Sequence, residues 1–185
     1  MSKQYWSETI IWAVADGTAM ANTTTEAILF PNITIPANFM ADGRILRVTA
    51  YGRLSTTGTP TMVFALRWGG VAGTVITQSG TVTCGSGVTA APWKVEVIIQ
   101  VRSNGSAGTV YAMGECFIWD DAAGSTGSAT NAPGIGAMGS AGAATPATVA
   151  IDMTADTALA ITGDWSAASA SNTITGHNYI IEALN

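Results

Sequence analysis

Apolar and polar residues alternate in short runs along most of the chain, and this alternation predicts β-strands. The clearest run spans residues 93–101, where Trp, Val, Val, Ile and Val take every second position. A period of two is that of a strand with one buried and one exposed face. Similar runs cover residues 46–54, 62–68 and 110–118. The last of these follows a Ser-Asn-Gly-Ser turn, so we expect it to return antiparallel to the strand at 93–101.

Weaker runs complete an all-β pattern. They predict further strands at residues 28–35, 71–77, 79–84, 146–152, 157–165 and 173–184. The chain has only six Leu, five Glu and two Lys among 185 residues, so strong helix formers are scarce and no significant helix is expected. Antiparallel strands in this number must hide their edges, which predicts an antiparallel two-sheet sandwich or a closed barrel. Among sandwiches we favour a jelly roll over an immunoglobulin-like fold.

The N-terminal segment does not continue this series of alternating runs. We expect residues 1–25 to form an arm and linker, and residues 26–185 to form the sandwich domain. The arm ends in a polar Asn-Thr-Thr-Thr linker, and its apolar side chains include Tyr5, Trp6, Ile10, Ile11 and Trp12. Two interpretations stay open for them: an arm that docks on a neighbouring molecule, or an ordinary first strand of the sandwich.

A second departure is the stretch at residues 122–145, which is rich in Gly, Ala and Ser and contains no charged residue. Such a stretch has few side chains to bury and much backbone entropy to lose on ordering. We therefore expect a long loop there.

Composition and charge exclude several classes of protein. The hydrophobic content of 48% is ample for a core, and the net charge is −5. An acidic chain with seven scattered basic residues is a poor binder of nucleic acid. No apolar run is long enough to span a membrane. The first residues also lack the basic-then-apolar order of a secretory signal.

The sequence offers little for catalysis, and we predict no catalytic, cofactor-binding or metal site. His177 is the single histidine, and we expect it in a strand at a sheet surface or subunit contact. Cys84 and Cys116 could pair, but we favour two buried thiols. Asp120 and Asp121 follow a strand and are typical of a solvated turn, with calcium ligation as a minor alternative.

Three segments carry a resemblance to a known class of protein. They are ANTTTE (21–26), IPANFMADGRILRVTA (35–50) and GRLSTTGTPTMVFALRWGG (52–70). Together they resemble a pattern met in virion structural proteins of tailed bacteriophages, over about 50 of the 185 residues. The resemblance implies a jelly roll related to tumour-necrosis-factor-like trimers, used as a capsid decoration (cement) protein or as the head of a fibre.

This resemblance sets the functional hypothesis. We expect a non-enzymatic homotrimer that binds the major capsid protein on the outside of the virion and stabilises the capsid. It would be made in the host cytoplasm and would need no cofactor. Its contact candidates are Tyr5, Trp6, Ile10, Ile11 and Trp12. The alternative is a receptor- or glycan-binding head of a fibre or tail, since six tryptophans could build a sugar-binding platform. A polysaccharide-cleaving enzyme acting through Asp120 or Asp121 is a third hypothesis.

Overall fold

The computed structural model describes residues 8–31, 33–119, 134–140 and 146–185, and in them it holds strands and irregular structure but no helix. The strands are β1 (Glu8–Trp12), β2 (Met20–Ala21), β3 (Ala27–Ile28), β4 (Ile33–Ile35), β5 (Ile45–Ser55), β6 (Thr61–Trp68), β7 (Thr74–Ser79), β8 (Val82–Thr83), β9 (Ala91–Ser103), β10 (Gly108–Ile118), β11 (Gly134–Gly139), β12 (Thr148–Ile151), β13 (Thr157–Trp165) and β14 (Thr173–Ala183). The all-β prediction is confirmed for these residues. Nothing in the described part is a helix that could cross a membrane.

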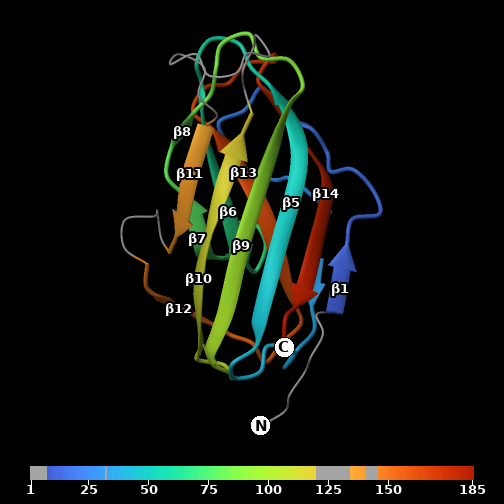
Figure 1. Ribbon diagram of the computed structural model, residues 1–185, viewed down its shortest axis with the longest axis vertical. Coiled ribbons are helices and arrows are strands. Elements are labelled where there is room, and N and C mark those ends of the chain that lie inside the picture. Colours follow the sequence, from blue (N-terminus) through green and yellow to red (C-terminus); the bar gives the residue numbers. More distant parts are fainter. Residues whose placement is uncertain (1–7, 32, 120–133, 141–145) are drawn as a thin grey trace.

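The strands form one antiparallel, hydrogen-bonded path that folds over itself into two layers (Figure 1). The front layer has the order β1-β14-β5-β9-β10, and the back layer has the order β7-β6-β13 with β3 and β4 beyond β13. One strand, β11, pairs with both β10 and β7 and so joins the layers along one side. The sandwich prediction is therefore confirmed, with a continuous strand path in place of two separate sheets.

Strands that follow one another in the sequence often lie in opposite layers. The chain passes from β4 in the back to β5 in the front, then to β6 and β7 in the back and β9 in the front. It crosses again between β13 and β14. This alternation is compatible with a jelly roll, which stays a prediction.

The core lies between the layers and contains an aromatic cluster. Phe30 meets Tyr179 edge-on with ring centroids 5.1 Å apart, and Trp93 edge-on at 6.1 Å. Phe64 of the back layer lies 5.2 Å from Trp93 of the front layer. Trp93 and Phe64 have no exposed surface. These large side chains hold the two layers at a fixed separation, because a close-packed interior resists any change in volume.

Glycine on the front layer makes room for this cluster. A Cβ atom on Gly52 would lie 2.0 Å from the carbonyl oxygen of Thr175 and 2.6 Å from the Trp93 indole. A Cβ atom on Gly176 would lie 2.5 Å from the Phe30 ring. Both positions face each other across β5 and β14. The sequence therefore needs glycine at both positions to seat the indole and phenyl rings beneath the strands.

The structure corrects the prediction of a loop at 122–145. Residues Gly134–Gly139 form β11, which pairs with five residues of β10. Small residues suit this strand, since Cβ atoms on Gly134 and Gly136 would meet Val82 side-chain atoms at 2.7 and 2.9 Å. The rest of the predicted loop lies outside the described residues, apart from Ser140.

In the N-terminal segment, residues 8–21 run along the edge of β14. β1 pairs with its C-terminal half and β2 with its first residues. Between them, the backbone N–H groups of Ala13 and Gly17 donate to the carbonyls of Tyr179 and Gly176. Within one chain, then, these residues form an edge ribbon of the front layer.

Candidate functional site: the front face

The outward side chains of the front layer form the most distinctive surface of the protein. Along β5, Leu46, Val48 and Ala50 point into the core, so the residues between them point outward. The same alternation holds on β9, β10 and β14. We call this surface the front face, and it comprises Arg47, Thr49, Tyr51, Arg53, Pro92, Lys94, Glu96, Ile98, Gln100, Tyr111, Met113, Glu115, Phe117, Asn178, Ile180 and Glu182.

Exposed apolar side chains gather on this face and its margins. Among the described residues, eight large hydrophobic side chains are exposed, and six lie here: Trp12, Tyr51, Ile98, Met113, Trp119 and Ile135. Three of them lie at the margins: Trp12 opposite Ile180, Ile135 opposite Phe117, and Trp119 at the end of β10. Ile98 lies opposite Met113 and Phe117 lies opposite Ile135, and adjacent apolar side chains of this kind on a surface are typical of interaction sites.

Strand register arranges the middle of the front face in rows. Ile98 of β9 lies opposite Met113 of β10, and in the next row Glu96 lies opposite Glu115. Lys94 lies opposite Phe117 in the row after that. Apolar, acidic and mixed rows therefore succeed one another along the strands.

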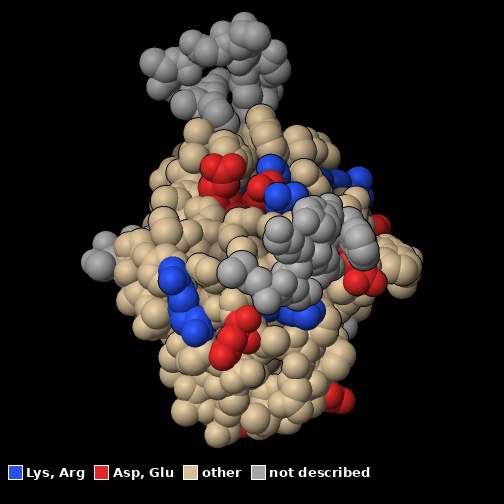
Figure 2. Space-filling model, turned by 60° about the horizontal axis from the view of Figure 1, so that its bottom comes forward, with Lys and Arg blue, Asp and Glu red and all other residues tan. Residues whose placement is uncertain are grey.

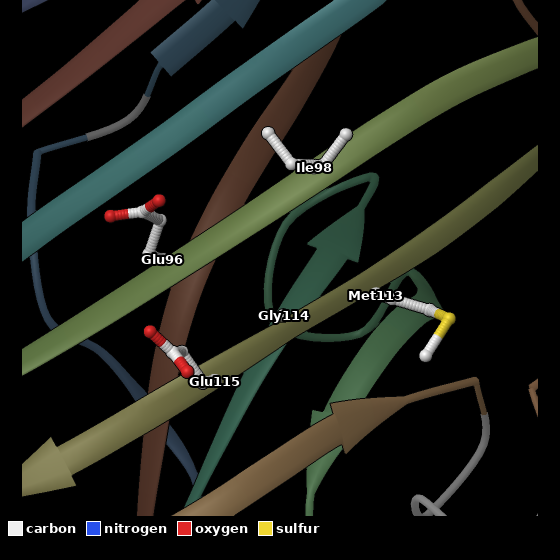
Figure 3. A pocket seen from close by; sticks show the side chains of 5 residues that line it. All are labelled: Glu96, Ile98, Met113, Gly114 and Glu115. Atoms are coloured by element: carbon white, nitrogen blue, oxygen red, sulfur yellow. The ribbon is translucent and has the colours of Figure 1, made fainter.

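A shallow hollow of about 340 Å³ opens between the first two of these rows. Its lining residues are Glu96, Ile98, Met113, Gly114 and Glu115 (Figure 3). Figure 3 shows the two carboxylates at one end of the hollow and the Ile98 and Met113 side chains at the other. The strands approach closely beneath it, because a Cβ atom on Gly114 would lie 2.1 Å from the carbonyl oxygen of Glu96.

Charges on the front face are partly paired. The Lys94 ammonium lies 2.7 Å from a Glu96 carboxylate oxygen, and this hydrogen bond is the main reason why the pKa of Lys94 is raised. Arg47 and Glu182 form a looser pair at 3.4 Å. On the side of the molecule seen in Figure 2, charged side chains stand singly or in small groups, separated by uncharged surface.

A second polar cluster lies on the back layer. Arg67 donates two hydrogen bonds of 2.6 Å to the two Glu26 carboxylate oxygens and a third of 2.9 Å to the Gly73 carbonyl. The Thr162 hydroxyl also donates to Glu26. Burial raises the pKa of Glu26, but the hydrogen bonds from Arg67 and Thr162 outweigh it and the net pKa is lowered. Burial, and then the Glu26 charge, raises the pKa of the neighbouring Asp164.

The predicted contact residues fall into three groups. Tyr5 and Trp6 lie outside the described residues. Ile10 and Ile11 pack partly buried against the core, and Trp12 is 59% exposed at the margin of the front face. Of the three candidates that the structure describes, Trp12 is the one that reaches the surface described above.

The structure describes three of the five residues that we considered for chemistry. Cys84 and Cys116 are both buried, as predicted. His177 lies on β14 at a bulge, where its Nδ1 atom is 2.9 Å from an Asp16 carboxylate oxygen. Asp120 and Asp121 lie outside the described residues. Over the described part of the chain, no three potential metal ligands converge.

Sequence reasoning missed the apolar residues of the front face. Ile98 interrupts the polar series Lys94, Glu96 and Gln100 on the outward side of its strand. On the next strand, Met113 belongs to an outward series of mixed character, Tyr111, Met113, Glu115 and Phe117. The interruption at Ile98 was the available signal. Its significance depends on register, which places Ile98 opposite Met113.

Comparisons with known proteins give little beyond this description. No family model and no curated protein matches the chain. Among solved structures, the chain is similar to the CBM2 module of the evolved Dit protein of Lactobacillus casei BL23 phage J-1. The identity is 11%, the alignment covers 97% of this chain and 96% of that chain, and the TM-score is 0.36. We base neither a fold family nor a function on a similarity of this size. What the fold and site define is an all-β sandwich with one sheet face on which exposed apolar and charged side chains are mixed.

Proposed function

We propose that this chain is a non-enzymatic structural protein of a tailed-phage virion, a homotrimer that binds the outside of the capsid and stabilises it. The resemblance of residues 21–70 to phage virion proteins supports the phage assignment. The observation that supports association with other molecules is the front face. This face and its margins expose six large apolar side chains.

The size of the front face suits a protein partner. Four neighbouring strands and five rows, taken as about 4.8 Å per strand and about 6.8 Å per row, give a surface about 19 Å wide and about 34 Å long, or roughly 650 Å² before side-chain relief is added. A stable interface buries about 800 Å² per partner. Its charges also balance, because Arg47, Arg53 and Lys94 are matched by Glu96, Glu115 and Glu182. A surface without net charge adds no strong repulsion when it packs against a neighbouring copy.

Light scattering on the purified protein tests self-association. We expect a mass three times the 18.8 kDa of one chain. Ile98→Glu would place a charge in the interface and release monomers. Val71→Glu is the matched control, because Val71 is 39% exposed and Ile98 is 37% exposed, but Val71 lies off the front face. A monomeric wild type, or equal effects of the two variants, would count against the proposal.

Capsid binding is tested on purified particles of the phage that encodes the chain. Hundreds of copies per particle would support decoration of the shell, and a dozen or fewer would place the protein at a vertex, neck or tail. A deletion that tests the N-terminal arm must stop at Ser7, because residues 8–21 pair with β14. We expect deletion of residues 2–7 to weaken binding to empty shells while the trimer stays intact.

Glycan binding is a second candidate, because one pair of aromatic side chains favours it. The Phe117 and Trp119 rings are stacked with centroids 5.7 Å apart, and Trp119 is 44% exposed. Exposed aromatic rings offer both an apolar surface and, in tryptophan, a polar N–H group. A glycan array would show binding that Trp119→Ala abolishes and Trp12→Ala, at the opposite margin, preserves. An array without binding would exclude this function.

A further inference from the structure

We propose that the hollow above Gly114 receives an arginine side chain of a second copy of this chain. The inference rests on the proposed function, because it takes the partner that covers the front face to be another copy. It adds a specific anchor to that interface and names the residues that form it.

The shape of the hollow suits a long basic side chain. Successive rows on one face of a strand are about 6.8 Å apart. Ile98 and Met113 line one end of the hollow, and the carboxylates of Glu96 and Glu115 line the other (Figure 3). Arginine has an apolar stem and a charged head, and such side chains lay the stem on apolar surface. With its stem on the Ile98 and Met113 side chains, the guanidinium would lie between the two carboxylates.

Charge favours a cation at this position. Like charges directly opposite each other on paired strands are unfavourable, and Glu96 lies opposite Glu115. Lys94 forms its ion pair with Glu96 at 2.7 Å. Glu115 forms no ion pair within the described residues. The three side chains therefore keep one negative charge in excess, which one incoming cation would neutralise.

The chain itself offers the matching group. A guanidinium carries five N–H donors in a planar fork and can bind two carboxylates at once, which suits the pair of Glu96 and Glu115 better than an ammonium does. Arg53 and Arg102 are exposed, and neither has a carboxylate partner in the part of the chain that the structure describes. Arg44 is half-buried over the Phe39 ring, whereas the Arg102 guanidinium lies 5.3 Å from the Tyr111 ring on the front face. We therefore assign the site to an arginine, with Arg53 and Arg102 as its candidates.

Sedimentation equilibrium over a dilution series tests the inference on the full chain. Truncating one partner of a desolvated charge pair costs about 2–5 kcal/mol, so Glu115→Gln should weaken self-association about 30-fold or more. Glu8→Gln is the control, because Glu8 is exposed, lies off the front face and forms no ion pair within the described residues, and its effect should stay below about five-fold. Circular dichroism would verify that both variants fold.

A charge swap then identifies the arginine. Glu115→Arg should weaken association, and combining it in one chain with Arg53→Glu or Arg102→Glu should restore association for the cognate residue. Restoration by one of the two double variants supports the proposal. An oligomer that Glu115→Gln leaves unchanged, or that neither double variant restores, overturns the inference but leaves the proposed function intact. A monomeric wild type overturns both.

Discussion

Replacing Glu26 by glutamine tests whether its ion pair with Arg67 stabilises the back layer. The substitution keeps the size of the side chain and removes its charge. The two hydrogen bonds are each 2.6 Å long, and the side chains of Arg67 and Glu26 are 18% and 23% exposed. Exposed pairs contribute about 0.2–1 kcal/mol, whereas breaking a buried pair costs about 3–5 kcal/mol. This pair lies between those cases, and we expect Glu26→Gln to lower the free energy of unfolding by about 1–3 kcal/mol.

The pH dependence of that loss follows from the pKa shifts. The lowered pKa of Glu26 means that its stabilising contribution is full above the unfolded value of 4.5 and is lost as pH falls through the folded pKa. Asp164, with its raised pKa, acts in the opposite sense: its ionised form opposes folding at neutral pH, and this penalty disappears on acidification. Glu26→Gln removes the stabilising contribution of the Glu26 carboxylate. It also weakens the penalty from Asp164, because the Glu26 charge is one of the causes of the raised Asp164 pKa. The difference between wild type and variant should therefore be largest near neutral pH and shrink towards about pH 3.5.

Urea unfolding followed by tryptophan fluorescence would measure the loss in the free energy of unfolding and its dependence on pH, with Tm as a second readout. For a chain of this size, each 1 kcal/mol corresponds to about 2–4 °C in Tm. Glu182→Gln is a matched control, because its pair with Arg47 is longer at 3.4 Å and the Arg47 side chain is 42% exposed. It should cost less than about 1 kcal/mol. Equal losses in the two variants, or a Glu26→Gln loss that does not change with pH, would refute the reasoning.

Two further predictions concern the core. Gly52→Ala should lower the free energy of unfolding by about 1–3 kcal/mol or more, because its Cβ atom would overlap the Trp93 indole and the Thr175 carbonyl. Gly80→Ala, where no atom lies within 4 Å of the added carbon, should have little effect in the same urea experiment. Burial raises the pKa of the Cys116 thiol to about 11, so iodoacetamide at pH 8 should label it only after unfolding. Rapid labelling of the native protein, measured by mass spectrometry, would contradict that assignment.

The strands that could be predicted are those whose side chains alternate strictly. The run predicted at 93–101 is the centre of β9, and the run predicted at 62–68 covers all of β6 except its first residue. β11 was missed because its sequence, GIGAMG, offers almost no alternation. Its glycines are required by contacts with Val82 and Cys116, which lie far away in the sequence. Only the folded arrangement shows that such a segment is a strand.

The candidate site depends on register in the same way. Glu96 and Glu115 are 19 positions apart in the sequence, and the turn between β9 and β10 decides that they meet. A shift of one residue would bring other side chains together and would turn the outward residues of one strand inward. The types of residue on the front face could be read from the sequence, but the hollow could not.

The outer surfaces of the two layers differ in how far their outward side chains are exposed to water. On the back layer, the outward residues Ala160 and Thr162 are already buried, at 1% and 0% exposure, and Thr162 is bonded to Glu26 beside the Arg67 ion pair. On the front layer, the outward residues Ile98 and Met113 remain 37% and 47% exposed. Covering the front face would therefore remove apolar surface from water, at about 25 cal/mol per Å². At Ala160 and Thr162 the back layer has little surface left to bury. For the partner proposed above, the exposed apolar side chains of Ile98 and Met113 favour binding at the front.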